Sequence, residues 1–408
     1  MVQDSANLGR RTVLAGLAGA VAAPAIVRAQ GRRAAKVSVG RQPFAAGNSP
    51  VTQYMINNKT FEKAAAAMGV DLTVDWRDYP SAIPMVEAFV SGNLDFGIWG
   101  NTPIVRMIAQ QQPIVLLNVG EGRLRFVVGV RPNSPIRNLA DLKGKTVGAL
   151  LGGDPYNAFT QILQFELGNG DPRAHGITMV NTPTQAQAAT IPSGMDAAIV
   201  IHPAYLQANA AIGTTGIVNS FGYTEAHYEG PAGKGAGILL DSVKKAPFYP
   251  DGYYLHRSFW ITSQNTVRNN RDVTVAFIVA QQQAIDALSA MPAGSVSELV
   301  KSFWNLPPEQ GAKVVEDEVL FKRGWCWPTE GDAAAVLEIS KYMVAGKIIE
   351  KPLAWAQVKG AFAQSQALLK EAYEKSGSKP AASAFEARDA ADLRGKPAWE
   401  IAAWKDRS

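Results

Sequence analysis

The sequence predicts an α/β protein built from two similar lobes, and three observations lead to this prediction. Short apolar runs alternate with helical stretches along most of the chain, an order typical of largely parallel sheets covered by helices. A local pattern of Ser-Gly, Asp and then Pro occurs twice, from Ser91 to Pro103 and from Ser193 to Pro203. The composition is that of a folded protein, because 47% of the 408 residues are hydrophobic and only 18% are charged.

The elements of the first lobe follow from local patterning. Runs rich in β-branched and aromatic residues predict strands, and the stretches between them predict helices. The predicted strands are residues 37–40, 70–74, 96–99, 114–119 and 126–130. The predicted helices are residues 51–68, 83–90 and 104–111.

The alternation continues in the second lobe and loosens after residue 205. The second lobe has predicted strands at 145–149, 177–180 and 197–201, and predicted helices at 156–167 and 184–191. Beyond it we expect a Gly- and Pro-rich insertion at 222–252, a strand at 258–262, and helices at 272–288 and within 330–374. Residues 375–397 read as a tail, after which Trp399 and Trp404 are expected to dock on the body.

Three loops end in a capping residue directly before a proline, namely Ser49-Pro50, Thr102-Pro103 and Asp154-Pro155. Such pairs begin helices, because Ser, Thr and Asp accept hydrogen bonds from the first turn and proline fits at the first helical position. Helix N-termini beyond the carboxyl ends of strands present N–H groups and a positive dipole end. The sequence therefore predicts an interlobe cleft suited to an anion or to polar oxygens. The alternative is that these residues are only helix caps.

Residues 1–29 are interpreted as an export signal. Arg10 and Arg11 precede an apolar run that ends in small residues, which is the order of a secretory signal. That run is about 15 residues long and contains Pro24, whereas a membrane span needs ~20. The paired arginines favour twin-arginine export, with an ordinary Sec signal as the alternative. Either route predicts a periplasmic or extracellular protein, and we expect the periplasm.

Residue counts exclude several functional classes. Cys326 is the only cysteine, so an intrachain disulfide and a multi-thiolate metal site are both impossible. The four histidines lack the spacing of a helical zinc motif, and Gly144-Lys145-Thr146 lacks the first glycine of a P-loop. A formal charge of +5 is low for a nucleic-acid-binding protein. We therefore expect no cofactor, no metal and no nucleic-acid partner.

Two motifs resemble those of a known family. The first, from Met85 to Gly97, contains Ala-Phe-Val-Ser-Gly-Asn-Leu-Asp-Phe-Gly, and the second, from Asn133 to Val147, contains Ser-Pro-Ile and Asp-Leu-Lys-Gly-Lys. Together they resemble the periplasmic substrate-binding proteins of nitrate-, sulfonate- and taurine-type ABC importers. That fold group includes binders of thiamine-pyrimidine precursors. Residues 79–163 carry the resemblance, which extends more weakly over 36–350.

This resemblance implies a bilobal type II periplasmic binding protein, in which two hinge segments join two α/β lobes around a ligand cleft. Lobe one would comprise residues 36–127 plus 256–375, lobe two residues 128–255, and the C-terminal tail residues 376–408. A monomeric receptor of this kind would close by a hinge motion on its ligand and deliver it to a membrane permease and its ATPase. The expected ligand is a small organic anion or zwitterion, such as a sulfonate, taurine or a carboxylate, with nitrate and pyrimidines as further candidates.

The resemblance also implies which loops contact the ligand. The expected ligand-binding residues are Gln42, Phe44, Asn48, Ser49, Ser81, Trp99, Asn101, Thr102, Gly153, Asp154, Tyr156, His202 and Tyr205. The aromatic side chains among them would line the cleft or belong to the lobe cores. Asp154 would either cap its own helix or point inward and favour a ligand amine. His202 stands where the family often has an acidic residue.

Two alternatives concern charge and catalysis. Arg123 and Arg125 would supply a counter-charge to the ligand or lie solvated at the surface. Some proteins of this fold, including sulfinate desulfinases, are enzymes with a nucleophilic cysteine in the first site loop. Residues 41–49 contain no cysteine, and Cys326 is expected to be buried. An exported desulfinase- or hydrolase-like enzyme that uses His202 is thus the alternative to a receptor, and a receptor for a signalling protein is a third reading.

Overall fold

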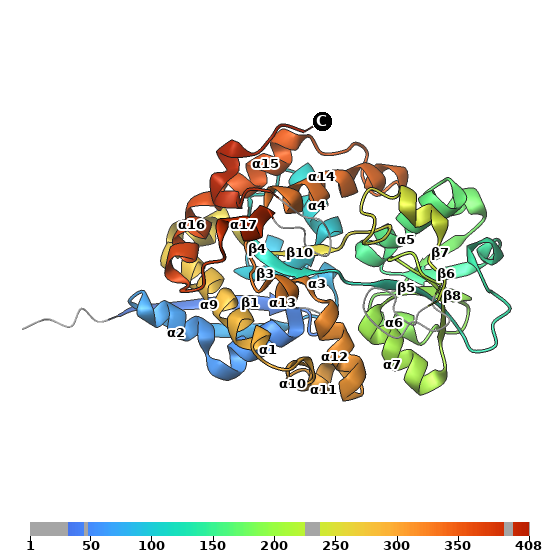
Figure 1. Ribbon diagram of the computed structural model, residues 1–408, viewed down its shortest axis with the longest axis horizontal. Coiled ribbons are helices and arrows are strands. Elements are labelled where there is room, and N and C mark those ends of the chain that lie inside the picture. The colour runs from blue at the N-terminus through green and yellow to red at the C-terminus, as the bar shows by residue number, and fades with distance from the viewer. Residues whose placement is uncertain (1–31, 45–47, 225–236, 387–394, 408) are drawn as a thin grey trace, which may run out of the picture.

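The computed structural model describes residues 32–44, 48–224, 237–386 and 395–407. It contains two five-stranded sheets, with strand orders β2-β1-β3-β10-β4 and β7-β6-β8-β5-β9. The two sheets lie in separate bodies, the first in the left and middle of Figure 1 and the second at its right. We call these the first body and the second body.

Most strands of both bodies are apolar and buried, whereas the edge strands β2 and β7 carry polar and exposed residues. The first sheet comprises β1 (Arg33–Arg41), β2 (Val70–Asp78), β3 (Phe96–Gly100), β4 (Ile114–Gly122) and β10 (Arg257–Ser263). The second sheet comprises β5 (Phe126–Val130), β6 (Thr146–Ala149), β7 (Thr178–Asn181), β8 (Ala197–Ile201) and β9 (Thr215–Asn219). The sequence predicted all of these except β9.

Each sheet is mixed rather than largely parallel, which corrects the sequence prediction. In the first sheet β1 pairs in parallel with β2 and β3, but β10 runs antiparallel to both β3 and β4. In the second sheet β5 runs antiparallel to both β8 and β9. The chain crosses into the second body between β4 and β5 and has returned by β10. A strand that arrives from the other body is not tied to the helical crossover that makes neighbouring strands parallel.

Helices cover the sheet of the first body. Its N-terminal helices are α1 (Asn48–Asn58), α2 (Thr60–Ala67), α3 (Ala82–Val90) and α4 (Asn101–Ala109). After β10 come α8 (Gln264–Asn269), α9 (Arg271–Ser289), α10 (Ala293–Glu298), α11 (Lys301–Trp304), α12 (Pro308–Asp317) and α13 (Val319–Arg323). The chain then forms α14 (Glu330–Ala345), α15 (Trp355–Ala363), α16 (Gln366–Lys375) and α17 (Ala382–Glu386). The single helix predicted at 51–68 is two helices, because Lys59 adopts a φ of 49° between them.

The second body has three α-helices among its described residues, and each of them begins close to the end of a strand. These are α5 (Asp154–Leu167), α6 (Gln185–Ala189) and α7 (His202–Ile212). Helix α7 follows β8 without an intervening residue, and α5 starts shortly after β6. Both helix starts therefore lie at the carboxyl edge of the sheet, where the sequence analysis places the cleft.

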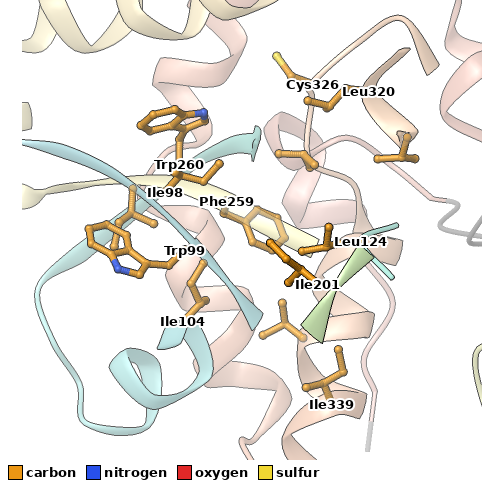
Figure 2. Close-up of a cluster of buried hydrophobic side chains, with 14 of the residues drawn as sticks. Ile98, Trp99, Ile104, Leu124, Ile201, Phe259, Trp260, Leu320, Cys326 and Ile339 are labelled. Atoms are coloured by element: carbon orange, nitrogen blue, oxygen red, sulfur yellow. The ribbon is translucent and has the colours of Figure 1, made fainter. Parts of the chain in front are cut away.

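Aromatic stacking fills the core of the first body. Phe277 of α9 stacks on Phe96 at a ring distance of 4.7 Å and meets Trp260 edge-on at 4.8 Å. Figure 2 shows Trp260, Trp99 and Phe259 within the buried cluster. The rings are fully buried, so the sheet is held to its helices chiefly by apolar packing.

The end of the chain packs on the first body. Trp399 stacks on Tyr373 of α16 at 4.5 Å, and Trp404 meets Phe362 of α15 edge-on at 5.7 Å. Trp404 is only 3% exposed, so it is a docking anchor as predicted.

Two predicted segments fall partly or wholly outside the described residues. The export signal at 1–29 lies entirely outside them, as does the middle of the 222–252 insertion. Among the described helices, none has the length and apolar character needed to cross a membrane.

Candidate functional site

A cavity of about 90 Å³ lies between the two bodies. Gln42, Phe44 and Ser81 line it from loops that follow β1 and β2, and Gly153 and Asp154 line it from the start of α5. Its volume is below the ~300–1,000 Å³ of most ligand pockets. In this arrangement of the bodies the cavity therefore admits only a small molecule or a small headgroup.

Asp154 links the two bodies at the cavity wall. Its carboxylate Oδ1 accepts a hydrogen bond from the backbone N–H of Thr102 at 2.8 Å and another from the hydroxyl of Tyr254 at 2.5 Å. Thr102 belongs to the first turn of α4, so a carboxylate of the second body caps a helix of the first. The N-cap position of α5 itself is Gly153. The expectation that Asp154 caps its own helix is therefore wrong, because its side chain finds donors across the interface.

A second carboxylate, that of Glu121 near the end of β4, contacts the N-terminus of α1. The backbone N–H of Asn48, the first residue of α1, donates to Glu121 Oε2 at 3.3 Å. The side chain of Glu121 is 2% exposed and lines the cavity. The N-termini of α1 and α4 thus both face a carboxylate of the protein.

His256 lies between these two carboxylates. Its Nδ1 is 3.6 Å from Glu121 Oε1, and its Nε2 is 3.8 Å from Asp154 Oδ2. Burial lowers the pKa of His256 to about 4, an effect that Asp154 opposes and Arg257 reinforces. The imidazole is therefore neutral at pH 7 and adds no positive charge to the cavity.

Several predicted site residues lie just behind the cavity wall. Asn48 and Asn101 are fully buried, and the Asn101 amide donates to the Leu255 carbonyl at 2.6 Å. Thr102 Oγ1 accepts a hydrogen bond from the Asn157 amide at 3.0 Å. Ser49 Oγ donates to the Pro43 carbonyl at 2.5 Å. These side chains position the helix starts rather than line the cavity.

Three of the four predicted aromatic residues do not line the cavity. Trp99 is fully buried in the first body (Figure 2). Its ring packs against that of Phe89 at a centroid distance of 5.2 Å. The Tyr205 hydroxyl accepts a hydrogen bond from the backbone N–H of Gly216 at 3.1 Å, inside the second body. Tyr156 is half-buried and faces the Gly346 carbonyl. Alternating side-chain direction along β3 explains Trp99, because its neighbours Ile98 and Gly100 face the cavity instead.

His202 belongs to a buried ion-pair network next to the cavity. Arg125 Nη2 lies 2.7 Å from Asp317 Oδ2, and Arg125 Nη1 lies 3.1 Å from His202 Nε2. Arg123 pairs with Asp251 at 2.8 Å and with Asp317 at 2.9 Å. Arg125 is buried, the side chain of Arg123 is 8% exposed, and both are paired, so they are neither solvated surface residues nor counter-charges in the cavity. Burial and the charge of Arg125 lower the pKa of His202 well below its usual value.

Cys326 is buried, and its surroundings do not activate the thiol as a nucleophile. Its thiol contacts the Gln282 side chain, and burial raises its pKa to about 12. In the described part of the chain, no cluster of His, Cys, Asp and Glu side chains could hold a metal ion.

Sequence reasoning missed several residues of the site, among them Glu121, Tyr254, His256 and Ser258. Glu121 follows a predicted strand and could have been found by the carboxyl-edge rule that pointed to Thr102. The other three belong to the return crossing and β10, whose antiparallel placement beside β3 cannot be read from local patterns.

Comparisons with known proteins agree with this architecture. The model of the NMT1/THI5-like family matches residues 66–295, which is more than half of the chain. An aliphatic sulfonates-binding protein of Escherichia coli K12 is 28% identical over 139 residues. That stretch is 32% of this chain and 41% of the relative, so the match spans less than half of the curated protein's length.

Solved structures share the fold at low sequence identity. The alkanesulfonate-binding protein SsuA of Xanthomonas axonopodis pv. citri, bound to MOPS, superposes with a TM-score of 0.58 and 16% identity, covering 81% of this chain and 98% of that one. The desulfurization enzyme DszB superposes with a TM-score of 0.50 and 14% identity, covering 79% of this chain and 95% of that one. The chain thus has the periplasmic binding protein fold, which both a binding protein and an enzyme use.

Proposed function

The chain belongs to the NMT1/THI5-like family, and from that premise we propose that it is the extracytoplasmic solute receptor of an ABC importer. It captures a small organic anion or zwitterion, of the sulfonate, taurine or carboxylate kind, in the cavity between its bodies. It acts in the periplasm as a monomer and delivers the solute to a membrane permease and its ATPase. Its lobes are residues 36–127 plus 256–375 and residues 128–255.

The observation that carries this proposal is a cavity whose walls come from two bodies. Asp154 of the second body and Glu121 of the first lie on the two sides of His256. A solute held between such walls bonds to both at once and favours the arrangement in which they are close. A permease can then distinguish the loaded protein from the empty one by the relative position of its lobes.

The enzyme alternative finds less support in the cavity. The only cysteine, Cys326, is buried elsewhere, and His202 is engaged with Arg125 outside the cavity wall. A desulfinase- or hydrolase-like activity on this fold needs a nucleophile in contact with the solute. Turnover that survives Cys326→Ala and disappears in His202→Ala would favour the enzyme over the receptor.

Thermal unfolding against a solute panel tests the receptor function. The panel contains alkanesulfonates, taurine, carboxylates, nitrate and aminopyrimidines, and native mass spectrometry first checks that the purified protein carries no solute. A ligand at ~100 times its dissociation constant adds about 2.7 kcal/mol to the free energy of unfolding. We expect one chemical class to raise the melting temperature without being consumed. Ligand-free protein that responds to none of these solutes would contradict the proposal.

A further inference from the structure

We propose that Glu121 and Asp154 select a ligand with a protonated nitrogen, which binds in the cavity beside His256. This inference rests on the proposed receptor function and narrows its ligand class to compounds with a cationic nitrogen, zwitterions included. A solute that is only an anion is rejected. Glu121 and Asp154 are thus the specificity-determining residues of the cavity.

The first argument for a cationic ligand is the charge of the side chains that line the cavity. The side chains of Glu121 and Asp154 are 2% and 12% exposed, so solvent screens their charges weakly. Arginine and lysine are absent from the described residues that line the cavity. The nearby Arg123 and Arg125 are committed to Asp251 and Asp317. An anion in the cavity would therefore meet two carboxylates and no cationic side chain, whereas a cation would be attracted by both.

The second argument is that the N–H groups at the helix N-termini beside the cavity already have acceptors. In an anion site the backbone N–H groups of a helix start point at the ligand. Here the N–H of Thr102 donates to Asp154, and the N–H of Asn48 donates to Glu121. The protein's own carboxylates already occupy these donor positions. Each carboxylate thus caps a helix start and adds negative charge to the cavity wall, which suits a cationic ligand that donates N–H bonds.

Two buried polar atoms give an independent indication of a ligand. His256 Nδ1 and Ser258 Oγ belong to residues that line the cavity and are each 4% exposed. Neither atom has a hydrogen-bond partner among the described residues. A buried polar group without a partner is costly, so a ligand that bonds to it is favoured. A neutral imidazole can accept at one ring nitrogen, and the Ser258 hydroxyl can accept or donate, so both can receive N–H bonds.

Matched solute pairs test the inference by isothermal titration calorimetry at pH 7. Taurine is compared with ethanesulfonate, and 4-aminobutyrate with butyrate, so that each pair differs by one protonated amine. We expect at least one amine to bind and its partner without nitrogen to bind at least tenfold more weakly. If ethanesulfonate or butyrate binds as well as its partner, the inference fails while the receptor function stands. If ligand-free protein binds none of the four solutes and none of the wider panel, both proposals fail.

Variants place the selection on the two carboxylates. Asp154→Asn and Glu121→Gln keep the size of each side chain and remove its charge. Each should reduce the taurine-to-ethanesulfonate affinity ratio, or that of the pair that binds, by about tenfold or more. This ratio is the readout because a merely loosened fold would weaken both members of a pair. Asp71→Asn, on the exposed edge of β2, is the matched control and should leave the ratio unchanged.

Either variant alone is sufficient if the other fails to fold, because the two carboxylates come from different bodies. A ratio that stays the same in the folded variants would overturn the assignment of Glu121 and Asp154.

Discussion

The carboxylate of Asp154 lies 2.8 Å from the backbone nitrogen of Thr102, so the first residue of α5 in one body satisfies the first turn of α4 in the other. Helix N-termini leave N–H groups that need an acceptor, and here the acceptor comes from across the cavity. Any motion that separates the bodies must break this bond and expose Thr102 to water or ligand. This hydrogen bond therefore holds the two bodies together and also forms part of the cavity wall.

Removing the hydrogen bond between Asp154 and Thr102 should favour an arrangement in which the two bodies are separated. Asp154→Ala removes the acceptor of Thr102 and the partner of the Tyr254 hydroxyl. Without ligand, we expect a larger radius of gyration by small-angle X-ray scattering than in the unaltered protein, with Asp71→Ala as the control. An identical scattering profile would show that this bond does not hold the bodies together.

A substitution at Gly100 should disturb the same hydrogen bond without changing the charge of the protein. A Cβ atom at this position would lie 1.9 Å from Asp154 Oδ2, so Gly100→Ala must displace the carboxylate. We expect this variant to reproduce the scattering change of Asp154→Ala. The result would be contradicted by a Gly100→Ala protein that scatters like the unaltered one.

Trp99 should affect stability rather than binding. The ring is fully buried and packs against Phe89, so Trp99→Ala should lower the free energy of unfolding by about 3–5 kcal/mol. Gln42→Ala, at the cavity wall, should cost about 1 kcal/mol or less, because it removes one hydrogen bond to the Ile98 carbonyl. Urea unfolding measures both. A Trp99→Ala protein of normal stability that loses its ligand would place Trp99 in the site instead.

Asp332 holds a buried group of charges at the start of α14. Its carboxylate lies 3.0 Å from Arg257 Nε and 3.4 Å from Arg323 Nη1, and it accepts the backbone N–H of Thr329 at 2.9 Å. Asp332→Ala should lower the free energy of unfolding by about 3–5 kcal/mol, since it removes the negative partner of buried arginines. The exposed pair Asp241–Lys244 provides the control, and Asp241→Ala should leave the urea midpoint unchanged. Equal midpoints for the two variants would contradict the prediction.

The buried neutral state of His256 predicts a pH effect on stability. Burial lowers its folded pKa to about 4, whereas an unfolded histidine has a pKa of ~6.5. Below pH 6.5 the unfolded chain binds a proton that the folded chain does not, so stability falls as the pH drops from about 6.5 to about 4. The contribution of this one residue is about 3 kcal/mol over that interval.

Urea unfolding at pH 7 and pH 4.5 measures this loss in the unaltered protein and in His256→Gln. The variant should lose less stability between the two pH values, because it has no proton to take up at this position. An equal loss in both proteins would assign the pH dependence to other groups, such as His202.

Much of the candidate site follows from local sequence, but the partners of its side chains do not. The Thr102-Pro103 and Asp154-Pro155 pairs lie in the first turns of α4 and α5, as the preference of proline for helix starts predicts, although neither Thr102 nor Asp154 caps its own helix. That Asp154 caps α4 instead of α5 depends on how closely the bodies approach, which no local pattern encodes. Trp99 shows the same limit, because its strand is predictable but the face on which it lies depends on register.

The sequence alone determined the alternation of strands and helices, the two copies of that pattern and the places where helices begin, since short-range hydrogen bonding and side-chain periodicity set these features. Only the tertiary structure decided that β10 returns antiparallel beside β3, bringing His256 and Ser258 to the cavity. It also decided that Glu121 and Asp154 take the helix donors that a bound anion would otherwise use. Such contacts join residues far apart in the chain, and their geometry depends on the packing of whole sheets and bodies rather than on any local preference.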